Sequence, residues 1–111
     1  MLAVQSGLSA NVLLLNRLYM AVRVVNPDAF HIIKHGAERI VPVSDDEIAN
    51  AVRVYYRTAH TLAEGAGAAP LAALLKEKTK MQGKRVGLIL SGGNIDMAKF
   101  AAILAGTTPQ S

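Results

Sequence analysis

The chain has 111 residues, the size of one domain, and 51% of them are hydrophobic although only 5% are aromatic. Such a core must be aliphatic, and the chain has more apolar side chains than a lone small domain easily buries, which favours a partner surface. The lack of cysteine excludes disulfides, thiolate metal sites and a cysteine nucleophile, and it fits a cytoplasmic location.

The net charge of +4 comes mostly from dispersed basic residues. One cluster lies around a predicted helix end and the following loop, at Lys76, Lys78, Lys80, Lys84 and Arg85. Cations complement the helix dipole there, and no aromatic residue lies among them for stacking on bases. We therefore expect a solvated helix end and no nucleic-acid partner. No apolar run has the length of a membrane span, so no membrane partner is expected.

The first 25 residues carry weak signals of secondary structure. Residues 11–19 are compatible with a strand or a helical turn, because the apolar run Val12–Leu15 is too short to decide. Residues 22–25 are typical of an extended segment. The start of the chain lacks the basic region and the cleavage site of a signal peptide.

A helix and a short strand follow. The turn at residues 26–28 has Pro27 and Asp28 where a helix begins, and the helix over 29–35 is ended by Gly36. The β-branched residues of 39–43 predict a strand, and Pro42 makes it an edge strand or a strand end.

A capping box begins the next helix. Ser44 is followed three residues later by Glu47, and an apolar face continues to about His60. The small residues over 65–69 predict a segment that permits very close backbone approach. A further helix is expected over 71–80, since Pro70 is tolerated in a first turn.

The last strand is predicted over residues 86–90. It ends at Ser91-Gly92-Gly93-Asn94 and turns directly into a helix over 95–105, followed by a frayed tail over 106–111. A strand that ends in small residues and opens a helix can bring a ligand to backbone amides. A small nucleotide- or anion-binding domain would use the same turn, but the chain lacks a P-loop lysine and a dinucleotide fingerprint.

Strands separated by helices imply parallel pairing in an α/β structure. We therefore expect part of a three-layer αβα domain with few parallel strands, two or three in number.

Three motifs occur in a specific order: VSDDEI at 43–48, AEGAGA at 63–68 and LSGGNID at 90–96. With MAVRV at 20–24 and PDAF at 27–30, they resemble the C-terminal portion of the pyridoxal-phosphate-dependent threonine/serine dehydratases. These enzymes belong to the fold type II, or tryptophan-synthase-β-like, group. The resemblance covers about residues 20–104 and about the last third of a complete family member. It implies a divergent segment over 1–19 and a dehydratase-like α/β domain over 20–105.

The family converts L-threonine or L-serine to a 2-oxo acid and ammonia, and the resemblance implies a cofactor-binding role for one turn. Ser91 would face the pyridine nitrogen, and a neutral hydroxyl does not enforce protonation there as a carboxylate would. Gly92 and Gly93 would let backbone approach the ring edge, and Asn94 would form the turn and cap the helix. The alternative is a plain turn in which Ser91 binds local amides.

Glu64 occupies the family's acidic position near the cofactor ring, and the alternative is a carboxylate that only serves the helix start. His60 resembles the family's histidine before this motif, although a helix-end histidine more often complements the dipole. His31 and His35 have metal-ligand spacing, but no third ligand is near, so we expect exposed histidines and no metal site.

Several parts of the family's active site have no counterpart in this sequence. These are the lysine that forms a Schiff base with pyridoxal phosphate, a Ser-Gly-Asn segment and a glycine-rich phosphate loop. Lys99 lies about two helical turns past Ser91 and is expected to point away from the strand ends. We therefore assign no catalytic residue and expect no stable binding of pyridoxal phosphate by this chain alone.

Two hypotheses follow. In the first, the chain is a C-terminal dehydratase piece, active only when a complementing fragment supplies the missing part. In the second, it is a non-catalytic structural or oligomerisation module derived from that fold. Residues 8–19 would then cover surface that the rest of the enzyme covers, in a homodimer.

Overall fold

The computed structural model describes residues 2–6, 12–17 and 26–109. Four strands form one sheet in the order β3-β1-β2-β4. The strands are β1 (Leu2–Ser6), β2 (Val12–Arg17), β3 (Arg39–Val41) and β4 (Arg85–Leu88). The helices are α1 (Pro27–Gly36), α2 (Asp45–Ala59), α3 (Gly65–Lys76), α4 (Lys78–Met81) and α5 (Met97–Leu104).

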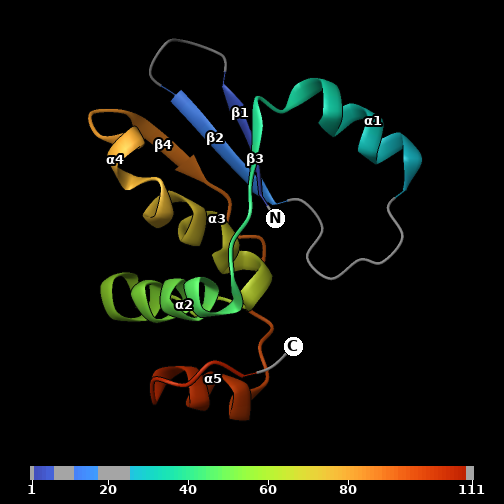
Figure 1. Ribbon diagram of the computed structural model, residues 1–111. Coiled ribbons are helices and arrows are strands. Elements are labelled where there is room, and N and C mark those ends of the chain that lie inside the picture. Colours follow the sequence, from blue (N-terminus) through green and yellow to red (C-terminus); the bar gives the residue numbers. More distant parts are fainter. Residues whose placement is uncertain (1, 7–11, 18–25, 110–111) are drawn as a thin grey trace.

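The sheet is mixed, so the expected parallel pairing is wrong for most of it. β1 pairs antiparallel with β2 and with β3, and β2 pairs in parallel with β4. β3 and β4 therefore point the same way, but the β1–β2 pair lies between them (Figure 1). The N-terminal segment thus supplies both central strands, and the ambiguous region 11–19 contains a strand. The extended segment expected at 22–25 lies outside the described residues.

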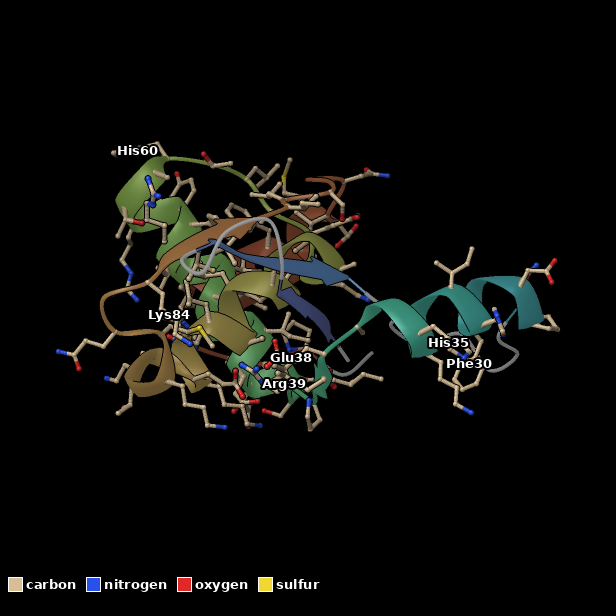
Figure 2. All side chains as sticks on the ribbon, turned by 90° about the horizontal axis from the view of Figure 1, so that it is seen from above. Phe30, His35, Glu38, Arg39, His60 and Lys84 are labelled. Atoms are coloured by element: carbon tan, nitrogen blue, oxygen red, sulfur yellow. The ribbon has the colours of Figure 1, made fainter. Side chains whose placement is uncertain are left out.

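The chain is an α/β structure in which helices are stacked away from the sheet. α3 lies against β1 and β2, α2 packs on α3, and α5 packs on α2 (Figure 1). A helical layer on the other face, which a three-layer domain needs, stays a prediction. α1 projects to one side of this stack (Figures 1 and 2).

The core between α2 and α3 is built from small side chains, which lets the two helix axes approach closely. Its fully buried members include Ala51 and Val52 of α2 and Ala68 and Ala69 of α3. Ile103 of α5 joins the same cluster. The expected aliphatic core is confirmed for this part of the chain. Among the described residues, no helix is both long and apolar enough to cross a membrane.

The helix expected over 29–35 is confirmed as α1, which also includes Pro27, Asp28 and Gly36, and the helix that begins after Ser44 is confirmed. Ser44 Oγ accepts from the N–H of Glu47 at 3.2 Å, and Glu47 Oε2 accepts from the N–H of Ser44 at 2.7 Å, which completes the capping box. The bond from the Ser44 N–H is the main cause that lowers the pKa of Glu47.

Three expected boundaries are wrong. α3 begins at Gly65, so Pro70 lies inside the helix, where it is buried against neighbouring elements. α5 begins at Met97, so an irregular segment over 89–96 separates it from β4. The tail is not frayed at Thr107, whose N–H and hydroxyl both donate to the Ala102 carbonyl, at 3.0 and 2.8 Å.

Candidate functional site

Two segments that are far apart in sequence cross in backbone contact. The Glu64 N–H donates to the Gly92 carbonyl at 3.1 Å. A Cβ on Gly67 would lie 2.5 Å from the Gly92 oxygen, and a Cβ on Gly93 would lie 2.6 Å from the Leu62 oxygen. Real Cβ atoms do not approach backbone so closely, so glycine is required at both positions. The close approach expected near 65–69 is confirmed, and Gly67 is the residue that needs it.

Ser91 lies on the irregular segment between β4 and α5, beside this crossing. Its side chain is exposed, and its hydroxyl makes no hydrogen bond within the described part of the chain. The alternative in which Ser91 binds local amides is therefore not observed there. A hydroxyl that can both donate and accept is left facing outward from a loop whose backbone is fixed at Gly92 and Gly93.

Glu64 precedes α3 directly, with extended backbone at φ −73° and ψ 162°. Its side chain makes no capping hydrogen bond with the helix. It lies instead against Gly92, where an added Cβ would meet Glu64 Oε1 at 2.8 Å. Glu64 thus stands at the N-cap position of α3, as the alternative of a helix-start carboxylate requires, but it makes no capping bond through its side chain. Glu64 is half-buried beside the segment that carries Ser91.

The expectation that Asn94 caps the last helix is wrong. The cap is Asp96, whose Oδ1 accepts from the N–H groups of Ala98 and Lys99 at 2.9 and 3.1 Å. The Ile95 N–H donates to the Gly93 carbonyl at 2.9 Å, and this tight turn keeps residues 94–96 outside the helix. Aspartate is also among the best N-cap residues, so the helix begins after Asp96.

An open cavity of about 320 Å³ lies between α2, the start of α3 and α5. Glu64 and Asn94 line it, whereas Ser91, Gly92 and Gly93 do not. Its other polar lining residues are Asp45, Asp96, Lys99 and Thr108, and its floor is apolar. The structure therefore brings Glu64 close to Gly92 and also to this cavity, but Ser91 lies outside the cavity lining.

Lys99 lines the same cavity as Glu64 and Asn94. Among the described residues, this cavity has no lining residue from a strand, so the expectation that Lys99 points away from the strand ends stays a prediction.

The three histidines divide into a pair and a single residue. His60 ends α2 with φ 50° and ψ 34°, in the left-handed region. His31 and His35 are exposed on α1, as expected. Within the described residues, no group of three or more potential ligands could hold a metal ion.

Comparison with known proteins places these residues in a family. A family profile described as pyridoxal-phosphate dependent enzyme matches residues 16–92, a range that includes Glu64 and Ser91 but not Asn94. The chain is 38% identical over 77 residues to L-threo-3-hydroxyaspartate ammonia-lyase of Pseudomonas sp.. It is 40% identical over 86 residues to L-threonine ammonia-lyase of Geobacter sulfurreducens, and 36% identical over 76 residues to serine racemase of Schizosaccharomyces pombe.

These three matches cover 69%, 77% and 68% of this chain, but only 24%, 21% and 24% of the respective relatives. The chain therefore spans about a quarter of the length of the curated relatives that it matches.

Proposed function

The chain belongs to the family of pyridoxal-phosphate-dependent enzymes, and on that basis we propose that it forms the wall of the cofactor site that faces the ring nitrogen. The observation that carries this proposal is the Ser91 hydroxyl, exposed and without a partner among the described residues. It stands on a loop that Gly67, Gly92 and Gly93 hold in place by backbone contact.

The chemistry of these residues suits the cofactor. The Ser91 hydroxyl can donate to an unprotonated ring nitrogen or accept from a protonated one, so it holds the ring without fixing the state of that nitrogen. When bound, pyridoxal phosphate supplies an electron sink for the substrate's α-carbon. Glu64 adds a half-buried carboxylate on the neighbouring backbone, and we propose that it acts near the ring.

For the complete protein we propose the conversion of L-threonine or L-serine to a 2-oxo acid and ammonia. The names of the relatives support this class, because they include ammonia-lyases for threonine and for 3-hydroxyaspartate. The chain alone is proposed to be inactive, since its sequence has no glycine-rich phosphate loop and no lysine in a matching context.

Reduction with borohydride in the presence of pyridoxal phosphate tests the isolated chain. We expect no stoichiometric adduct by mass spectrometry and no ammonia from L-threonine or L-serine. A full adduct on a single lysine, accompanied by ammonia release, would show that the chain is active alone.

A chimera tests the role of Ser91. Residues 20–105 would replace the matching segment of the Geobacter L-threonine ammonia-lyase, which supplies the rest of the fold. We expect release of ammonia from L-threonine, and we expect Ser91→Ala to lower kcat/KM by about tenfold or more and to shift the cofactor absorbance. Thr79→Ala, an exposed hydroxyl on α4, is the matched control and should change neither. A Ser91→Ala chimera with unchanged absorbance and rate would contradict the role.

A second candidate is a non-catalytic oligomerisation module. The exposed large apolar side chains favour it, above all Met97, Ile32 and Phe30, which are 84%, 70% and 49% exposed. Burial of such groups is a common driving force for association. We expect a homodimer in sedimentation experiments at micromolar concentration, and a monomer there would contradict this candidate.

A cytoplasmic location stays a prediction.

A further inference from the structure

α1 presents two histidines on one face. His31 and His35 are one helical turn apart, and both are exposed. Their ring centroids are 4.2 Å apart, with 42° between the ring planes. Two imidazole nitrogens bound to one divalent ion lie within about 4 Å of each other, because each bond is about 2.1 Å long. The two rings are neighbours on one face of the helix, close enough for a small change of side-chain rotamer to direct one nitrogen of each toward a shared ion.

One hydrogen bond fixes which nitrogen of His35 is free. His35 Nδ1 lies 2.8 Å from the His31 carbonyl oxygen. A carbonyl can only accept, so Nδ1 must carry the proton, and the lone pair of the neutral ring is then on Nε2. Metal-binding histidines usually have this arrangement, in which the second ring nitrogen donates to a carbonyl or a carboxylate. In the neutral ring, Nε2 of His35 is therefore the nitrogen that is available to bind a metal ion.

The location of α1 leaves the pair accessible. The helix projects from the rest of the molecule, and Figure 2 shows His35 on it, on the opposite side of the view from His60. The charged neighbours on α1 are Asp28, three residues before His31, and Lys34. No group of three or more ligands exists among the described residues, so solvent would complete the coordination shell.

The sequence indicated no metal site at this pair because no third protein ligand is near. We propose instead that His31 and His35, completed by solvent, form a two-histidine site for a divalent transition metal that prefers imidazole, with Cu²⁺ bound more tightly than Ni²⁺ or Zn²⁺. Two protein ligands and several waters make an exchangeable site rather than a structural one. The site rests on α1 alone and is independent of the proposed cofactor wall.

To test this proposal, the full, untagged chain is titrated with CuCl₂ and, separately, with ZnCl₂. Binding is monitored by calorimetry and by NMR of the three histidine rings. We expect one Cu²⁺ per chain, with stronger binding than for Zn²⁺. Paramagnetic Cu²⁺ should broaden the ring signals of His31 and His35 before those of His60. His31→Gln and His35→Gln should each weaken binding by about tenfold or more.

His60→Asn is the matched control, because it removes the third histidine while asparagine tolerates the left-handed backbone there. It should bind Cu²⁺ as the unchanged chain does. Circular dichroism of each variant verifies that the fold is retained. Equal broadening of all three histidines, or unchanged affinity in His31→Gln, would overturn the proposal.

Discussion

At the scale of single residues, the backbone crossing at Gly67 is the most constrained contact of the candidate site. A Cβ added to Gly67 would lie 2.5 Å from the Gly92 carbonyl oxygen, which already accepts a hydrogen bond from the Glu64 N–H. Backbone cannot move aside as a flexible side chain can. We therefore expect Gly67→Ala to lower the free energy of unfolding by about 1–3 kcal/mol, measured by urea unfolding.

Gly65→Ala is the matched control, because it adds the same methyl group to the same helix two residues earlier. Its Cβ would meet only Ile48 Cγ2, at an ordinary 3.5 Å. Alanine also has the higher helix propensity, so we expect stability to stay unchanged or to rise by up to about 1 kcal/mol. Equal losses in the two variants would show that the crossing is not the cause.

This crossing shows how much of a contact between two residues can be predicted from the sequence. The small residues at 65–69 predicted close approach, but not its partner, because Gly67 and Gly92 are distant in sequence. The contact depends on how α3 and the loop after β4 pack together. The motif alone predicts Ser91 as a ligand residue, and the exposure of its side chain is compatible with that prediction.

At the scale of elements, the end of α2 carries local strain. His60 has φ 50°, although left-handed backbone is unfavourable for a residue with a side chain. Its N–H still bonds the Tyr56 carbonyl at 3.1 Å, so the conformation is part of the helix cap. We expect His60→Gly to raise the free energy of unfolding by about 1 kcal/mol in the same unfolding assay.

His60→Ala separates this backbone effect from loss of the imidazole. Alanine has a Cβ and keeps the left-handed penalty, so the substitution should give no stabilisation. If His60→Ala stabilised the chain as much as His60→Gly, the imidazole would be the unfavourable group and the backbone argument would be wrong.

Elements with local signals were predictable, and those set by packing were not. The helix after Ser44 begins where its capping box predicts, because both bonds of the box lie within four residues. α3 begins earlier than its propensity suggests, since Gly65 and Gly67 are poor helix formers. Its small residues are buried against α2, and this packing outweighs the propensity.

At the scale of the whole molecule, the order of strands could not be derived from sequence. β3 and β4 were expected to pair, because helices separate them in the chain. The two strands of the N-terminal segment intervene, and their short apolar runs gave no indication of partner or direction. Pairing of this kind depends on contacts across long sequence separations, which local periodicity does not encode.

One ion pair connects β3 to the helices across this molecule. Arg39 donates through Nη2 to Glu77 Oε2 at 2.5 Å and through Nε to Oε1 at 3.4 Å, and Glu77 lies between α3 and α4. The Glu77 side chain is only 12% exposed, so the pair is screened less than a surface pair. Figure 2 shows Arg39 beside Glu38, which contacts it from the neighbouring position at 3.1 Å.

This pair predicts a pH dependence of stability. Hydrogen bonding from Arg39 is the main cause that lowers the pKa of Glu77 below its ordinary value of 4.5. A carboxyl with a lowered folded pKa stabilises the fold above its unfolded pKa, and this contribution is lost as pH falls through the folded pKa. We therefore expect Glu77→Gln to cost about 1–2 kcal/mol at pH 7, and the difference from the unchanged chain to shrink below pH 4.5.

Urea unfolding at a series of pH values measures this difference, and Glu38→Gln is the matched control. Glu38 contacts the same guanidinium, but its side chain is 47% exposed and solvent screens the pair. Its loss should change stability by less than about 1 kcal/mol at every pH. A Glu77→Gln difference that stays constant from pH 7 down to pH 3 would mean that packing of this side chain, and not its charge, joins β3 to the helices.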